Sequence, residues 1–104
     1  MTRARLCGVE DLAVGEARRF DVDGARICLV RCSGGFRAIA DTCSHEDFSL
    51  SEGAVDPDAC EVECWKHGSA FSLLDGEPLT LPATRSVAVY EVLVDAAGVS
   101  VVLP

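Results

Sequence analysis

Two short motifs hold the residues of this chain best suited to transition-metal chemistry. The first is Cys-Ser-His at residues 43–45, and the second is Cys-Trp-Lys-His at residues 64–67. Each motif supplies one thiol and one imidazole, and together they use both histidines of the 104-residue sequence. Thiolate is a soft ligand and imidazole a borderline one, and both bind transition metals well. Two such loops facing each other could hold one metal centre with two sulfur and two nitrogen ligands.

The mixed ligands within each motif favour one kind of centre over another. Zinc often takes a tetrahedral Cys2His2 set, but zinc knuckles usually pair two ligands of one type. A mixed knuckle suits a [2Fe–2S] cluster in which one iron takes both cysteines and the other both histidines. Gly68, directly after the second motif, permits the tight backbone approach that a cluster loop needs. We therefore favour a [2Fe–2S] cluster and keep a structural zinc module as the alternative. The predicted ligands are Cys43, His45, Cys64 and His67.

The length and charge of the chain limit its organisation and its partners. A length of 104 residues, of which 49% are hydrophobic, is that of one globular domain spanning residues 1–104. The net charge of −8 argues against nucleic acid and anionic membranes as partners. Between Ala38 and Trp65 there are eight acidic residues and no Lys or Arg. This acidic segment is either a solvated face or a surface that steers a basic partner toward the motifs.

The six cysteines fit either a secreted disulfide framework or an intracellular metal protein. The first residues, 1–20, contain no apolar signal-peptide core, and no apolar run approaches the roughly 18 residues of a membrane span. We therefore expect a cytoplasmic protein with reduced thiols and no membrane segment. Cys28 and Cys32 would lie about 13 Å apart along one strand, too far for a disulfide. We interpret these two cysteines, with Cys7 and Cys60, as structural residues.

Short alternating runs separated by turn signals predict an all-β fold. Asp23-Gly24 is a strong signal for a two-residue hairpin. Between residues 42 and 84 the strands become short and loops dominate. The pattern predicts a β framework, formed by residues 1–41 and 85–104, that is interrupted by an insertion carrying both motifs. Strands are expected at 4–9, 17–22, 25–32, 36–41, 60–64, 87–94 and 99–103, with an extended stretch at 79–82.

The stretch from Cys43 to Pro82 resembles the Rieske iron–sulfur family, and more narrowly the small ferredoxins of bacterial multicomponent dioxygenases. The resemblance implies an antiparallel β sandwich or barrel as the base, with residues 42–84 as an inserted cluster-binding subdomain. Besides the two ligand motifs, it rests on Ser49-Leu50-Ser51-Glu52-Gly53, on Gly68-Ser69 and on Leu81-Pro82-Ala83.

The resemblance also implies a role for each site residue. Cys43 and Cys64 would hold the buried iron, and His45 and His67 the outer iron near the surface. Around them, Gly68 and Ser69 follow the second motif, and the Ser69 hydroxyl falls where some relatives hydrogen-bond a bridging sulfide. Pro82 matches the loop that covers the cluster, and we interpret Trp65 as packing that shields it.

Two departures from the family pattern bear on the reduction potential. Respiratory-chain members close a disulfide between the cluster loops, but Asp47 or its neighbours and Lys66 occupy those positions here. Phe71 stands where those proteins have a tyrosine that hydrogen-bonds a cysteine sulfur. Fewer hydrogen bonds to sulfur stabilise the reduced cluster less, which predicts a potential in the lower part of the roughly −150 to +300 mV Rieske range. The spacer between the motifs is also longer than usual, and we expect this to alter only a surface loop at 56–60.

The remaining sequence offers no second chemistry. With both histidines assigned to the cluster, none is left for a 2-His-1-carboxylate iron site, and no glycine-rich nucleotide motif is present. The resemblance implies a one-electron carrier, not an enzyme, that takes electrons from a flavin-dependent reductase and passes them to a terminal non-haem iron oxygenase. The alternatives are a Rieske-like small subunit of a nitrite reductase and a ferredoxin linked to cluster assembly.

Overall fold

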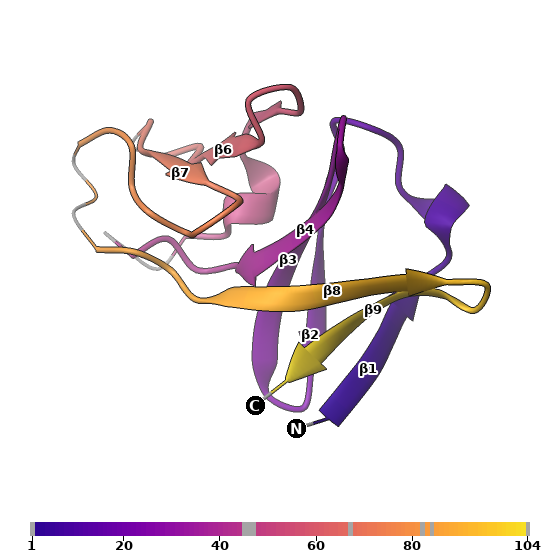
Figure 1. Cartoon of the computed structure of the whole chain (residues 1–104). Helices are drawn as coiled ribbons and strands as arrows, with labels where there is room; N and C mark the ends of the chain where they lie inside the picture. The colour runs from indigo at the N-terminus through magenta and orange to yellow at the C-terminus, as the bar shows by residue number, and fades with distance from the viewer. Residues whose placement is uncertain (1, 45–47, 67, 82, 84, 104) are drawn as a thin grey trace.

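Two antiparallel sheets build the fold in a computed structural model of the chain (Figure 1). The structure describes residues 2–44, 48–66, 68–81, 83 and 85–103. The larger sheet has six strands in the order β1-β9-β8-β4-β3-β2, and the smaller has three in the order β5-β6-β7. The strands are β1 (Thr2–Cys7), β2 (Ala17–Val22), β3 (Ala25–Cys32), β4 (Gly35–Ala40), β5 (Val55–Asp56), β6 (Glu61–Glu63), β7 (Ala70–Ser72), β8 (Val89–Asp95) and β9 (Gly98–Leu103). Two short 3-10 helices are η1 (Val9–Asp11) and η2 (Leu50–Glu52).

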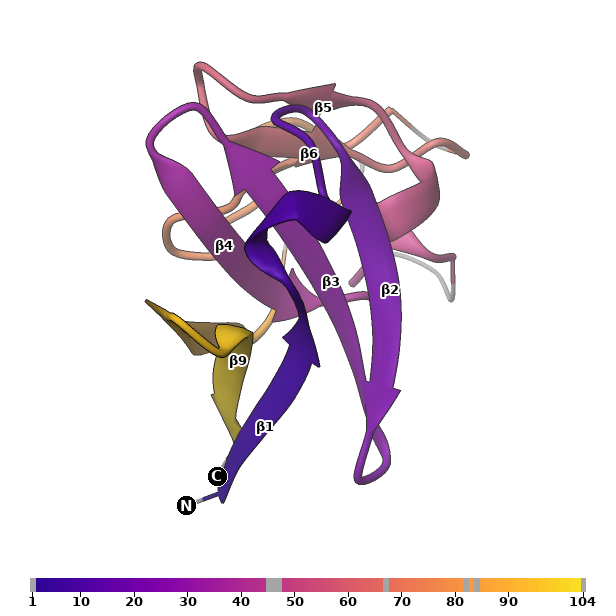
Figure 2. The same cartoon turned by 90° about the vertical axis from the view of Figure 1, so that its right-hand side faces the viewer.

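The six-stranded sheet curls into an open barrel, with the β1-β9-β8 half crossing the β4-β3-β2 half (Figures 1 and 2). Strands β4 and β8 join the halves through the residue pairs Ala38–Tyr90 and Ile39–Val89, and the Ala40 N–H donates to the Ala88 carbonyl at 2.8 Å beside them. The hairpin between β2 and β3 turns at Asp23-Gly24, where both residues have positive φ (49° and 82°), as a two-residue turn of this type requires. The predictions of an all-β fold and of this hairpin are confirmed.

Strand β3 separates two hydrophobic cores. Its alternate residues Ile27 and Leu29 face one core, whereas Cys28 and Val30 face the other, and all four are fully buried. Strand β3, expected at residues 25–32, is therefore a central strand that is apolar on both faces. The barrel core consists of Cys7, Leu12, Ile27, Leu29, Ala38, Val99, Val101 and Leu103. The loop core consists of Cys28, Val30, Cys32, Ile39, Cys43, Leu50, Cys60, Val62, Cys64, Phe71, Leu73, Ala83 and Val87.

The small sheet lies within the segment expected to contain mainly loops, between the end of β4 and the start of β8 (Figure 1). The expected strand at 60–64 is present as β6, with Val62 buried and its acidic neighbours more exposed. Strands β5 and β7 were not predicted, because each has only two or three residues and is held by pairing with β6. The expected extended stretch at 79–82 contains no strand among its described residues.

The turn at 56–60 docks this small sheet on the barrel. The main-chain N–H of Ser33 donates to the Pro57 carbonyl at 3.0 Å, and the Ser33 hydroxyl to the Asp58 carboxylate at 2.5 Å. Beside them, Cys32 and Cys60 form a disulfide with Cα atoms 5.5 Å apart. The expectation of reduced thiols is therefore wrong for these two cysteines. The turn is a surface loop, as expected, with Asp56, Asp58 and Ala59 exposed, and it also links the two parts of the molecule.

Candidate metal centre

The first predicted ligand, Cys43, lies on a short hairpin that continues from β4. The hairpin is closed by a hydrogen bond from the Cys43 N–H to the Phe48 carbonyl (2.9 Å) and by a bridge between Thr42 and Ser49. The N–H of Leu50 then donates to the Asp41 carbonyl at 2.6 Å. His45 is one of residues 45–47, which lie outside the described residues.

The second predicted ligand, Cys64, lies on a turn that follows β6. Its N–H donates to the Ser69 carbonyl at 2.7 Å, and its carbonyl accepts from the Gly68 N–H at 2.9 Å. The φ of 75° at Gly68 is in the left-handed region that glycine adopts without steric cost. His67 lies outside the described residues. The described part of the chain thus contains the two cysteines of the predicted ligand set and neither histidine.

A third loop closes over the second one. The Ala83 N–H donates to the Ser69 hydroxyl at 3.0 Å, and the Thr80 hydroxyl accepts from the Ala70 N–H at 2.8 Å. Farther along, the Ser44 hydroxyl donates to the Arg85 carbonyl at 2.5 Å, which connects this loop to the first one. Pro82, the predicted covering residue, lies outside the described residues.

The three loops bury both cysteines in the loop core. Cys43 is 2% exposed and Cys64 is fully buried. Phe71 is also fully buried. The rings of Phe48 and Trp65 meet edge to face, with centroids 5.2 Å apart, and so connect the first and second loops. Trp65 nevertheless remains half exposed, which gives it an apolar surface as well as a packing contact.

The described residues fit a metal–sulfur group. Two thiols, strong ligands for iron once deprotonated, converge in a site that excludes water. Ser69 is fully buried, and its hydroxyl accepts a hydrogen bond from Ala83 but donates to no other described residue. A buried hydroxyl without an acceptor is costly. A sulfide or thiolate sulfur between the loops would provide that acceptor.

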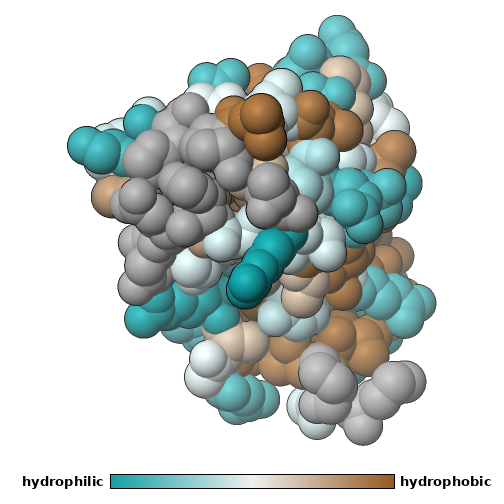
Figure 3. Space-filling view, turned by 90° about the vertical axis from the view of Figure 1, so that its left-hand side faces the viewer, coloured by the Kyte–Doolittle hydropathy of each residue, from teal (hydrophilic) through white to brown (hydrophobic). Residues whose placement is uncertain are grey.

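The surface of this end of the molecule combines apolar and hydrophilic groups. Figure 3 shows brown apolar surface beside teal hydrophilic surface on the face that contains these loops. Leu79, Leu81 and Trp65 are 48%, 77% and 51% exposed. Most described carboxylates of the acidic segment are exposed or partly exposed, but Asp41 is buried. The interpretation of Asp41 as a surface charge is therefore wrong, because charge patterning alone carries no signal of burial.

Comparisons with known proteins agree with this arrangement. The family described as the Rieske [2Fe-2S] domain matches residues 2–91. The chain is 41% identical to the 3-phenylpropionate/cinnamic acid dioxygenase ferredoxin subunit of Shigella flexneri serotype 5b, across 100% of this chain and 96% of that protein. The ferredoxin of carbazole 1,9a-dioxygenase from Nocardioides aromaticivorans IC177 superposes with a TM-score of 0.92 at 33% identity, covering 97% of each chain.

A second solved match is a chain in a complex of reduced oxygenase and oxidized ferredoxin in carbazole 1,9a-dioxygenase. Its TM-score is 0.88 at 36% identity, covering 95% of this chain and 91% of that one. Within the described residues, no helix is both long enough and apolar enough to cross a membrane. The predicted resemblance, the [2Fe–2S] cofactor and the role of electron carrier are confirmed. The chain belongs to the Rieske [2Fe–2S] family, in which it is a ferredoxin, an electron-transfer component and not the catalytic enzyme.

Proposed function

We propose that this chain serves a multicomponent aromatic-ring dioxygenase, carrying one electron at a time from a flavin-dependent reductase to a terminal non-haem iron oxygenase. The observation that carries the proposal is the burial of Cys43 and Cys64 together beneath three hydrogen-bonded loops. The complex of oxygenase and ferredoxin found for a relative supports the oxygenase as a partner. The reductase and a cytoplasmic location remain predictions.

The proposed ligands are Cys43, His45, Cys64 and His67, within a cluster-binding subdomain at 42–84. When bound there, a [2Fe–2S] cluster supplies a centre that takes up and releases one electron. The chain's own residues hold the two thiolates apart from water in the loop core. The Ser69 hydroxyl is available to donate a hydrogen bond toward sulfur, which would favour the reduced state.

The surface of the loops supports docking to a protein partner. The exposed leucines and Trp65 provide apolar area near the site, and the acidic residues around them favour a basic partner surface. Charged surfaces mainly accelerate encounter, and salt screens them over about 8 Å at physiological ionic strength. We therefore expect reduction of the oxygenase by this protein to slow as salt concentration rises.

The experiment that tests this function uses the purified holoprotein. We expect two irons and two inorganic sulfides per chain, a Rieske-type electron paramagnetic resonance spectrum on reduction, and a potential in the lower part of the Rieske range. Mixed with a flavoprotein reductase and an aromatic-ring oxygenase, it should support substrate turnover that stops when it is omitted. A colourless protein with one zinc per chain would contradict the proposal.

A further inference from the structure

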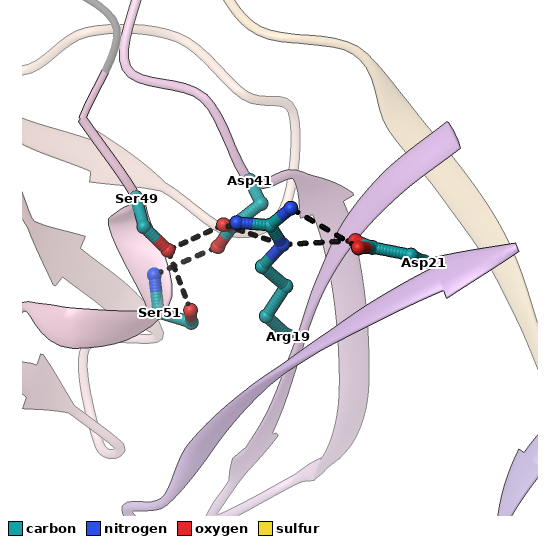
Figure 4. A network of polar contacts seen from close by, with 5 residues as sticks. All are labelled: Arg19, Asp21, Asp41, Ser49 and Ser51. Carbon is teal, nitrogen blue, oxygen red and sulfur yellow. Dashed lines mark hydrogen bonds and ion pairs between the residues drawn. The ribbon is translucent and has the colours of Figure 1, made fainter. Parts of the chain in front are cut away.

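The carboxylate of Asp41 is buried beneath the first cluster-binding loop, which is the hairpin closed by the bridge between Thr42 and Ser49 (Figure 4). One oxygen, Oδ1, accepts from the Ser51 N–H at 2.9 Å, and the other, Oδ2, accepts from the Ser49 hydroxyl. The two serine hydroxyls are themselves hydrogen-bonded at 2.8 Å. The backbone of Asp41 is held at both ends, by the Arg26 carbonyl at 3.0 Å and the Leu50 N–H at 2.6 Å. Asp41 therefore joins the end of β4 to residues 49–51 through main chain and side chain alike.

The charge of this carboxylate is only partly balanced. Arg19 Nε lies 3.9 Å from Asp41 Oδ2, beyond ordinary hydrogen-bonding distance. The same guanidinium makes two closer hydrogen bonds to Asp21, at 2.8 and 3.1 Å (Figure 4). The Arg19 side chain is 40% exposed, whereas that of Asp41 is 2% exposed. Asp41 thus places a negative charge in the interior, while much of its counter-charge lies in solvent.

This charge lies close to the proposed cluster ligands. Asp41 precedes Cys43 by two residues, so their Cα atoms are at most about 7 Å apart. The contacts to residues 49–51 close the base of the hairpin that carries Cys43. The Asp41 charge also acts on a thiol of the loop core. Burial raises the pKa of Cys28, and repulsion from the Asp41 carboxylate raises that pKa further.

We propose that Asp41 is a positioning residue for the first cluster-binding loop, and that its buried charge lowers the reduction potential of the cluster. The inference rests on the proposed function, because it requires a cluster at Cys43 and Cys64. Hydrogen bonds to a charged acceptor are stronger than neutral ones, so the carboxylate fixes the loop more firmly than a neutral group would. A fixed negative charge opposes addition of an electron nearby, because like charges repel most strongly where solvent is excluded.

The electrostatic part is tested with Asp41→Asn in the holoprotein. The amide oxygen of asparagine can accept from Ser51 and its NH2 can donate to the Ser49 hydroxyl, so the contacts are replaceable while the charge is lost. We expect the ratio of reduced to oxidised cluster at a fixed ambient potential to rise about threefold to tenfold, where tenfold corresponds to about 59 mV for a one-electron couple. The control is Asp21→Asn, which removes the exposed carboxylate charge that pairs with the same residue, Arg19.

Three results would decide this part. The proposal is supported if the midpoint potential rises more in Asp41→Asn than in Asp21→Asn. It is overturned if the midpoint of Asp41→Asn equals that of the wild type, or if the two variants shift by the same amount. Arg19→Gln removes the counter-charge and should move the midpoint in the opposite direction, which keeps the proposal testable if Asp41→Asn fails to fold. A wild-type protein without a cluster would instead overturn the proposed function.

The positioning part is tested with Ser49→Ala, which removes one donor but leaves the charge. We expect loss of the cluster to an iron chelator to become about threefold or more faster, with a change in the g-values and a smaller change in midpoint than for Asp41→Asn. Ser33→Ala is the matched control, because its hydroxyl also donates to an aspartate but at the turn far from the cluster loops in sequence. Equal chelation rates for the two serine variants would overturn the positioning role.

Discussion

The barrel core and the loop core are closed by different means. Around the barrel core, strands of six to eight residues pair along most of their length. Around the loop core, strands of two or three residues pair briefly. The loops are held by hydrogen bonds and by single contacts that include one disulfide, one edge-to-face ring pair and one buried carboxylate. Many weak pairings tolerate the loss of any one of them. The loop core should therefore depend far more on individual residues.

The largest expected effect comes from loss of a proposed cluster ligand. In Cys64→Ser we expect no cluster to be retained, because one of its thiolate ligands is lost. A cluster that binds only the folded site contributes its binding free energy to folding, so its loss should destabilise the loop core. Hydrogen exchange should then accelerate across residues 50–73 while β2, β3 and β9 remain protected. Cys28→Ala is the control, since it removes a buried thiol of the same core without a proposed ligand role. If both cores lost protection from hydrogen exchange equally, the loop core would not depend more on individual residues than the barrel core does.

A smaller effect is expected from the disulfide that joins the two parts. Cys32 and Cys60 are 28 residues apart in sequence, and closing a loop of that length stabilises the folded state by about 3.5 kcal/mol in the chain-entropy description. The double variant Cys32→Ala, Cys60→Ala should lose about this much in denaturant unfolding while keeping its cluster absorbance. Dithiothreitol should destabilise the wild type similarly and leave the double variant unchanged. Loss of the cluster in the double variant would place these cysteines in the site.

The close approach of two backbones at Gly53 should have a more modest effect. A Cβ at this position would lie 1.6 Å from the Glu63 carbonyl oxygen, so Gly53→Ala must push η2 and β6 apart. Overpacking of this kind typically costs about 1–3 kcal/mol. Gly34→Ala is a matched control in the turn between β3 and β4, where an added Cβ meets nothing within 4 Å. Equal melting temperatures for the two variants would show that the loops adjust freely.

The same contrast explains which parts of the structure could be predicted from sequence. Strands β2 and β3 were predicted at their observed bounds, because alternation and the Asp23-Gly24 turn are local signals. Strands β5 and β7 carry too few residues for periodicity, and their pairing is set by tertiary contacts. The two ligand motifs were readable because their residue types and spacing are local.

Non-local features of the site could not be read in the same way. Cys28 and Cys32 are too far apart on one strand to pair, whereas Cys32 finds its partner, Cys60, in the turn before β6. Asp41 stands in sequence among exposed acidic residues, and the residue type alone does not reveal that its carboxylate is buried. Cys32 and Asp41 both connect the barrel to the loops. Each contacts a residue that lies farther along the chain, and no local sequence pattern specifies that partner.

The smallest expected effect concerns an ion pair on the barrel surface. Arg3 on β1 contacts Asp95 at the end of β8, and both side chains are nearly half exposed. The hydrogen bond from Arg3, followed by that from the Ala97 N–H, holds the pKa of Asp95 below its usual range. A lowered pKa means that the ionised carboxylate stabilises the folded state. That contribution is fully present above about pH 4, where the unfolded chain is also ionised, and is lost as pH falls through the lowered folded pKa.

Arg3→Ala should therefore reduce stability slightly at neutral pH and make unfolding less sensitive to acid below about pH 4. Exposed pairs are screened by salt, so the difference from wild type should shrink at high ionic strength. The control is Arg37→Ala. Arg37 is an exposed arginine on β4 that forms no ion pair with a described residue. A salt-independent loss as large as that from opening the disulfide would show that the barrel also depends on single contacts. The barrel and loop cores would then not differ in the way proposed here.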